Sequence, residues 1–274
     1  MFRKIASITL IILSVALIGW SAVAETADEI LDRMDAEADA LAEGSLISII
    51  RFDNVYGDGT SASNLFGSLS IPDHSLIYFI EPLDVAGTIF LTIESEEEDE
   101  DARLILYLPF IGAPKELVSE EERGGSFAGS ALSYSDLGDR EGRADYDAVL
   151  LGEEELDIDG QSRTAYKIES TAKPGVDVDA PRSILWIDTE FLIMLKLESY
   201  NDLGNLDTSM EVLELGEFEG KLTADVMLAT SHSDDSTTTI TVLEQRRPAG
   251  AISPDVFLPE NLGAFDAAAW GFAE

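Results

Sequence analysis

The sequence contains no cysteine. This absence excludes disulfide bonds, catalysis by a thiol and metal sites built from thiolates. It also excludes the acylated cysteine that bacterial lipoproteins carry at their mature N-terminus, so the chain is not anchored to a membrane by that route. Any binding or catalytic chemistry must come from other side chains.

Basic residues are also scarce. Lys and Arg number 17 against 54 Asp and Glu, which gives a net charge of −37. A surface of this sign repels nucleic acid and anionic membranes, so we expect no nucleic-acid partner. The acidic residues are spread along the chain, as is typical of a solvated surface.

Histidine occurs only twice, as His74 and His232. No pair of histidines has metal-ligand spacing, and no Gly-x-Ser-x-Gly elbow is present. The acidic run Glu94–Asp101 is expected to be a solvated loop rather than a cation site, because adjacent carboxylates repel one another. We therefore expect no metal, no cofactor and no enzymatic activity. A hydrolase is the least favoured alternative, with His232 as its best candidate.

The first residues have the layout of a secretory signal peptide. Met1–Ala24 starts with basic residues, continues with the apolar run Ile5–Ile18, and ends with the small residues Ala22 and Ala24. We predict cleavage after Ala24 and one exported domain over residues 25–274. The alternative is an uncleaved anchor, although the run is short for a spanning helix of about 20 residues.

One amphipathic helix is predicted, over Thr26–Glu43. Thr26 and Glu29 have the spacing of a capping box, and Gly44 is suited to end the helix. Its apolar residues recur at intervals of three and four, which places them on one face. That apolar face must be buried against another element, and a sheet is the element that this sequence predicts for it.

The rest of the chain is predicted to be mainly β. Apolar residues alternate in segments separated by turn signals such as Asp159-Gly160 and Glu219-Gly220. The expected strands are Leu46–Phe52, Asn64–Ile71, Ser75–Glu81, Gly87–Glu94, Ala102–Leu108, Ala144–Leu151, Arg163–Ser170, Arg182–Asp188, Leu192–Tyr200, Leu206–Leu215, Lys221–Ala229 and Thr237–Glu244. The stretch Pro109–Arg123 is expected to be irregular. The pattern favours one strongly curled antiparallel sheet, left open so that the helix and short helices cover its concave face.

Gly124–Leu137 is expected to be an ordered turn segment where two β-rich halves meet. It combines three glycines and four serines with Phe127 and Tyr134. Glycine permits unusual backbone angles, and serine and aspartate bond to nearby backbone. A structural role is favoured over direct ligand contact.

Several predicted strands carry bulky apolar residues at successive positions rather than at alternate ones. They are residues 76–80, 89–91, 104–108 and 192–195. A strand with one wet face would alternate apolar and polar residues. Either both faces lie in an ordinary core, or the concave face lines a cavity for an apolar ligand.

The turn segment also carries a resemblance. Gly125–Ser130 followed by Tyr134–Leu137 resembles the hallmark of the bacterial outer-membrane lipoprotein-sorting protein family, which is related to the LolA and LolB carriers. Weaker matches follow in the expected order, over roughly Ala27 to Leu262. They are Gly87–Leu91, Leu106–Pro109, Trp186–Asp188, Tyr200–Gly204 and Pro254–Phe257.

The resemblance implies an open antiparallel half-barrel of the LolA/LolB type whose mouth is closed by helices. It also implies a periplasmic location and a hydrophobic cavity for acyl chains. Two departures stand out. The family's aromatic-rich strand reads Leu104–Pro109 here, and the basic cluster that often follows it is reduced to Lys115.

The function expected from these observations is a periplasmic carrier that binds acyl chains of lipoproteins or other lipids and moves them towards the outer membrane. Its expected partners are the acyl chain, an inner-membrane transporter and an outer-membrane acceptor, and the protein is expected to be a monomer. The predicted cavity-lining residues are Phe79, Phe90, Leu104, Leu106, Phe127, Trp186, Met194, Met210 and Met227. Phe127 is expected to plug the mouth, and the predicted lid residues are Ile30, Leu31, Met34 and Leu41.

The alternative is a periplasmic accessory or interaction module of an envelope transporter. A carrier should hold a cavity of roughly several hundred Å³ on the concave face, whereas a module should have a packed interior.

Overall fold

The computed structural model describes residues 25–95, 101–138, 143–176 and 178–273. The predicted signal peptide and most of the acidic run Glu94–Asp101 lie outside these residues. In the parts of the chain that are described, no helix is long and apolar enough to span a membrane.

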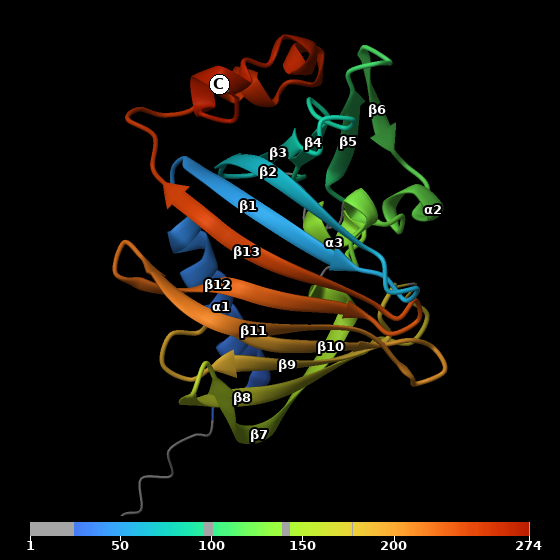
Figure 1. The fold of residues 1–274 in the computed structure, drawn as a ribbon. Coiled ribbons are helices and arrows are strands. Elements are labelled where there is room, and N and C mark those ends of the chain that lie inside the picture. Colours follow the sequence, from blue (N-terminus) through green and yellow to red (C-terminus); the bar gives the residue numbers. More distant parts are fainter. Residues whose placement is uncertain (1–24, 96–100, 139–142, 177, 274) are drawn as a thin grey trace, which may run out of the picture.

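One antiparallel sheet of thirteen strands forms the framework, in the order β6-β5-β4-β3-β2-β1-β13-β12-β11-β10-β9-β8-β7 (Figure 1). The strands are β1 Leu46–Val55, β2 Ser61–Ile71, β3 His74–Glu81, β4 Ile89–Ile93, β5 Arg103–Leu108, β6 Ala113–Leu117, β7 Tyr146–Ile158, β8 Gln161–Ala172, β9 Arg182–Asp188, β10 Met194–Tyr200, β11 Leu206–Phe218, β12 Lys221–Ser231 and β13 Ser236–Arg246. The predicted mainly β class and open sheet are confirmed.

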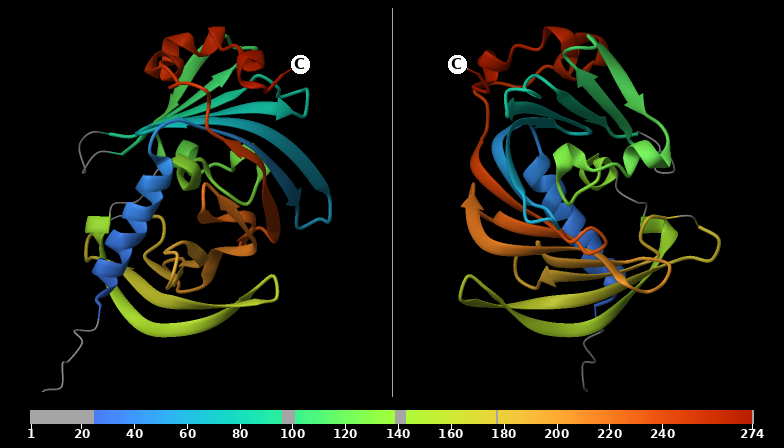
Figure 2. Two further views of the ribbon diagram at one scale, coloured as in Figure 1. Left: turned by 90° about the vertical axis from the view of Figure 1, so that its left-hand side faces the viewer. Right: turned by 45° about the vertical axis from the view of Figure 1, so that its right-hand side comes forward.

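The order of the strands corrects one expectation. Every neighbouring pair is consecutive in the chain except β1 and β13, where Phe52 lies opposite Ile240. The two halves of the sheet therefore meet at this pair and not at Gly124–Leu137. That segment instead belongs to the connection between β6 and β7, the two outer edges of the sheet. Figure 2 shows it lying inside the curve of the half-barrel.

The helices in the described residues of this connection are short, namely α2 Glu120–Arg123, η1 Phe127–Gly129, α3 Tyr134–Gly138 and η2 Arg143–Asp145. Strand β6, just before it, lies in the stretch Pro109–Arg123 that was expected to be irregular because of Pro109 and Pro114. Proline cannot donate to a β-ladder, but an edge strand needs only one ladder. Pro114 lies opposite Tyr107 at such an edge.

The long helix α1 spans Ala27–Ala42 and confirms the predicted cap. The Oγ1 of Thr26 accepts a hydrogen bond from the Glu29 N–H, and the Glu29 carboxylate accepts one from the Thr26 N–H at 2.8 Å. Gly44 follows with a φ of +82°, a conformation that suits glycine. The helix runs across the open, concave side of the sheet (Figure 2).

Both faces of the first half-sheet are covered, which explains the apolar residues at successive positions. Along β3, Leu76 packs on the outer face and Phe79 on the inner face. The inner face is covered by the β6–β7 connection. The outer face is covered by the C-terminal turns η3 Pro254–Phe257, η4 Pro259–Ala264 and η5 Ala267–Trp270. These C-terminal turns therefore lie on the convex face, not on the concave face that was expected for the short helices.

Glycine makes one of these contacts feasible. A Cβ added to Gly67 on β2 would lie 2.3 Å from the ring of Phe272. The ring stacks beside Tyr78, at 6.1 Å between centroids. The C-terminal tail thus packs directly on the sheet backbone.

Candidate apolar ligand site

A tight hairpin forms the centre of the β6–β7 connection. The Ser130 N–H donates to the Phe127 carbonyl and the Phe127 N–H donates to the Leu132 carbonyl, each at 2.8 Å. Ala128 and Gly129 both have positive φ, at 51° and 73°. Two consecutive residues of this kind are typical of the sharpest hairpin turns. The Gly-Ser-Phe-Ala-Gly-Ser sequence therefore builds a turn that projects one aromatic side chain.

That side chain, Phe127, is fully buried on the concave face. Its ring contacts four phenylalanine rings and one tyrosine ring at centroid distances of 5.4 to 6.1 Å. The partners are Phe52 on β1, Phe66 on β2, Phe79 on β3, Phe90 on β4, and Tyr134 on α3. Offset aromatic pairs of this kind stabilise beyond the area that they bury. The ring is thus packed against the strands of the inner face. That Phe127 plugs the mouth of the half-barrel stays a prediction.

Buried polar side chains attach the hairpin to the sheet. The Ala131 N–H donates to the Thr238 Oγ1 at 2.8 Å, and this hydroxyl donates to the Asn54 Oδ1 at 2.7 Å. The Asn64 side-chain amide donates to the Ala128 carbonyl at 3.3 Å. Because a buried backbone group without a partner is costly, these bonds fix the position of the hairpin.

The segments on either side of the hairpin are also anchored. Gly138, at the end of α3, lies so close to the inner face that an added Cβ would be 2.5 Å from the Leu104 Cδ2. Before the hairpin, Glu122 accepts hydrogen bonds from Lys115 and from the backbone, which lower its pKa to about 2. Lys115 is therefore held in an ion pair with Glu122 at the surface.

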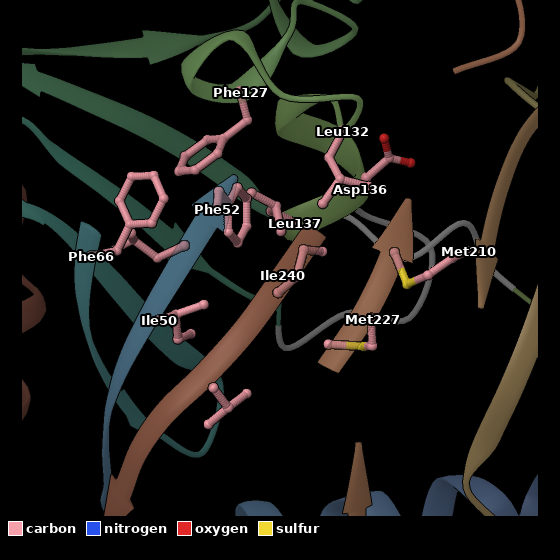
Figure 3. Close-up of a pocket in the computed structure, with 12 residues that line it drawn as sticks. Ile50, Phe52, Phe66, Phe127, Leu132, Asp136, Leu137, Met210, Met227 and Ile240 are labelled. Atoms are coloured by element: carbon pink, nitrogen blue, oxygen red, sulfur yellow. The ribbon is translucent and has the colours of Figure 1, made fainter. Parts of the chain in front are cut away.

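An apolar pocket of about 210 Å³ lies between the hairpin segment and the sheet (Figure 3). The sheet contributes Ile50 and Phe52 from β1, Phe66 from β2, Ile77 from β3, Met210 from β11, Met227 from β12, and Ile240 and Val242 from β13. The connection contributes Phe127, Leu132, Asp136 and Leu137. The carboxylate of Asp136 accepts hydrogen bonds from Ser133 and turns away from the apolar side chains (Figure 3).

The size of this pocket falls between the two expectations. Pockets that bury a drug-sized molecule usually have volumes of about 300–1,000 Å³. The interior is therefore not fully packed, yet the pocket as it stands holds only a short apolar segment. Met210 and Met227 form one wall, and methionine adapts its shape more readily than other apolar residues.

The predicted lining residues fall into three groups. Phe127, Met210 and Met227 line the pocket. Phe79, Phe90, Leu104 and Leu106 lie on the same inner face but pack under the connection, so they do not reach the pocket.

The third group, Trp186 and Met194, is placed elsewhere. Leu185 and Met210 both lie opposite Leu197, so these residues share the concave face. Neighbours in a strand point to opposite faces, which puts Trp186 on the convex face. There its ring lies 4.7 Å from both the Lys167 and the Lys196 ammonium. Met194 lies opposite Ile187, beside the cluster under α1.

Most of the predicted lid residues attach α1 to the sheet. Ile30 and Leu31 are buried against Ile168 and Ile187, and Met34 packs at the edge of this cluster. Leu41 is only partly buried and lies outside the cluster. The first half of the helix is thus firmly packed on β8 and β9.

Sequence reasoning missed most of the pocket wall. The missed residues are Ile50, Phe52, Phe66, Ile77, Leu132, Asp136, Leu137, Ile240 and Val242. The sequence pattern does indicate that two pairs share a face of the sheet. Ile50 and Phe52, like Ile240 and Val242, are two residues apart in a strand. Nothing in the sequence showed that β1 and β13 are neighbours.

The structure places the hydrolase candidate His232 outside the apolar pocket. His232 contacts the Ser209 hydroxyl through its Nε2 at 3.0 Å, on the surface. Among the residues that the structure describes, no group of acidic residues and histidines is arranged to hold a metal ion.

The fold and the pocket together define an open antiparallel half-barrel of the LolA type. A family model described as "Uncharacterized protein" matches residues 72–264, more than half of the chain, and the chain belongs to this family. A comparison with curated proteins found no match.

Solved structures of other proteins share this fold. A DUF1329 family protein from Desulfovibrio piger has a TM-score of 0.75 at 24% identity, covering 85% of this chain and 96% of that one. An outer membrane lipoprotein-sorting protein domain from Vibrio parahaemolyticus has a TM-score of 0.71 at 22% identity, covering 86% and 97%. A LolA superfamily protein from Nitrosomonas europaea has a TM-score of 0.64 at 17% identity, covering 86% and 98%. At these identities the likeness concerns the fold.

Proposed function

We propose that the protein is a carrier that binds the acyl chain of a lipid or lipoprotein, without covalent chemistry, on the concave face of the half-barrel. The observation that supports this function is the pocket of about 210 Å³, whose walls are apolar except for Asp136. The names of two structural relatives, a lipoprotein-sorting domain and a LolA superfamily protein, point the same way.

The binding energy would come from burying methylene groups. Each buried CH₂ contributes about 0.8 kcal/mol, which is close to a fourfold gain in affinity. Micromolar affinity corresponds to about 8 kcal/mol, so about ten buried methylenes would reach it before the entropic cost of binding is subtracted. Helix α1 and the β6–β7 connection flank the concave face and would act as the lid.

The setting of this function follows from the predicted signal peptide. After cleavage behind Ala24 the carrier would work in the periplasm as a monomer. It would receive its ligand from an inner-membrane transporter and release it to an outer-membrane acceptor. The cationic docking patch expected for such a family is weak here, because Lys115 already pairs with Glu122.

The test combines lipid analysis of the natively purified protein with displacement of a fluorescent fatty acid. Met227→Trp should fill the pocket and reduce probe affinity at least tenfold. Leu228→Trp is the matched control: its neighbour across the ladder is Glu211, whereas Met227 faces Val212 on the pocket side. The function is wrong if no lipid co-purifies and no probe binds, or if both variants bind the probe as wild type does.

A second candidate, an interaction module, is favoured by one feature of the surface. Leu83 in the β3–β4 loop and Phe110 in the β5–β6 turn are 89% and 83% exposed. The two turns are neighbours, since a Cβ added to Gly87 would lie 3.1 Å from the Pro109 ring. Large exposed apolar side chains often mark contact sites. Cross-linking in the periplasm should then capture a protein partner with wild type but not with Leu83→Ser/Phe110→Ser, and an unchanged pattern would exclude this role.

A further inference from the structure

The pocket ends at Phe127, but the apolar inner face does not. The rings of Phe79 and Phe90 lie 5.4 and 5.6 Å from the Phe127 ring, yet neither of them lines the pocket. Phe127 therefore has the open pocket on one side and a covered apolar surface of β3 and β4 on the other. Its side chain forms the wall between them together with α3, whose Tyr134 ring lies 5.2 Å from the Phe90 ring.

The wall belongs to a turn and not to a strand. The hairpin backbone around it is held independently by the Thr238 hydroxyl on Ala131 and by the Asn64 amide on Ala128. Truncating the ring leaves these two hydrogen bonds in place. The side chain can thus change in size while the hairpin keeps its position over the sheet.

The covered surface would suit the same ligand chemistry as the pocket. Beyond Phe127 the inner face continues through Phe79, Phe90 and Leu104, all of them buried apolar residues of β3 to β5. A chain that passed the position of the Phe127 ring would meet the rings of Phe79 and Phe90. The buried Thr92 hydroxyl lies on this face too, next to Leu104. Each additional methylene buried against the Phe79 and Phe90 rings would continue to gain affinity.

We propose that Phe127 is the specificity-determining residue for chain length: its ring stops a linear apolar chain that enters the pocket, and removing the ring joins the pocket to the surface formed by Phe79 and Phe90. This inference rests on the proposed carrier function. The chain length at which affinity stops rising is set by the size of residue 127, while the remaining pocket residues set the affinity per methylene.

The expected change in the chain-length limit follows from the apolar surface that a phenyl ring buries. Burial of a phenylalanine side chain is equivalent to that of roughly two to four methylenes. In wild type, affinity should rise about fourfold for each methylene and then level off. In Phe127→Ala the rise should continue for about two to four further methylenes. The longest chains would then bind about 10- to 200-fold more tightly than they bind wild type.

The experiment measures affinities for a homologous series of straight-chain fatty acids, from hexanoate to stearate, by displacement of a fluorescent fatty acid from the full mature chain. Phe257→Ala is the matched control. Phe257 is also fully buried, but it belongs to the C-terminal turn η3 and packs on the convex face. It should lower stability in the same way without moving the chain length at which affinity levels off.

Two further variants keep the test decisive if Phe127→Ala fails to fold. Phe127→Leu should move the limit to longer chains by a smaller step, and Phe127→Trp should move it to shorter ones. An unchanged limit in the variants that bind the probe overturns the role of Phe127 but leaves the carrier function standing. Absence of binding to wild type removes the carrier function itself.

Discussion

The attachment of the hairpin to the sheet depends on one hydroxyl group. Thr238 is completely buried on β13, and its Oγ1 both accepts from the Ala131 N–H and donates to the Asn54 Oδ1. Thr238→Val replaces this hydroxyl with a methyl group of similar size. The packing volume is retained, so the substitution isolates the two hydrogen bonds.

The expected loss of stability follows from the buried polar groups that are left without a hydrogen-bond partner. A buried donor or acceptor left without a partner costs about 1–3 kcal/mol. Thr238→Val leaves the Ala131 N–H and the Asn54 carbonyl oxygen in this state, and the Asn54 amide nitrogen already has no partner. We expect a destabilisation of about 2–4 kcal/mol. For a chain of this length that lowers Tm by roughly 5–15 °C.

The assay is thermal unfolding followed by near-ultraviolet circular dichroism, because the hairpin packs among aromatic rings. Thr239→Val is the matched control. Thr239 is the next residue on β13, it faces the other side of the sheet, and its side chain makes no hydrogen bond to the described residues. Its replacement should leave Tm almost unchanged.

A double substitution checks the cause of the loss. Asn54→Leu combined with Thr238→Val removes the unpaired amide together with the hydroxyl, so the pair should destabilise less than the sum of the single changes. Two results would contradict the reasoning. One is a Tm for Thr238→Val within error of that for Thr239→Val, and the other is strict additivity with Asn54→Leu.

Two further predictions concern packing and charge. Gly138→Ala should lower the free energy of unfolding by about 1–3 kcal/mol in denaturant unfolding, because the new Cβ would lie 2.5 Å from the Leu104 Cδ2. Gly250→Ala is the control and should be neutral, because the space around Gly250 is open. Equal effects of the two substitutions would argue against tight packing at Gly138. Burial tends to raise the pKa of Asp188, but hydrogen bonds from Arg163 and the backbone outweigh it and the pKa is lowered. Asp188 therefore stabilises the fold above its ordinary value of 3.8 and loses this contribution as pH falls through the folded pKa. Asp188→Asn should be less stable at neutral pH by about 3 kcal/mol and less sensitive to acid than wild type, and an equal acid sensitivity in urea unfolding would refute this.

Local features of the fold were readable from the sequence. The capping box of Thr26 and Glu29 and the stop at Gly44 involve residues that are close together in the chain, so residue type and spacing were sufficient. The pattern of apolar segments and turn signals likewise located twelve of the thirteen strands. It failed at β6, where Pro114 reads as a strand breaker unless the strand is known to be an edge.

The site itself was only partly readable. Apolar residues on both faces of β3 to β5 predicted burial on both sides, and this is what the tail and the connection provide. The sequence could not show which face is concave. Face alternation along its strand predicts Trp186 in the cavity, but its register against Lys196 places it on the convex face, one residue away from the concave Leu185.

The sequence by itself determined the helix, nearly all of the strands and the turn character of Gly124–Leu137, since periodicity, caps and turn residues act over a few positions. Only the tertiary structure decided that β1 pairs with β13 and that the hairpin segment links the two outer edges of the sheet. These contacts join residues far apart in the chain, and alternation is the same for any partner strand. The pocket beside Phe127 results from that long-range pairing, which brings β1, β13 and the hairpin together around it.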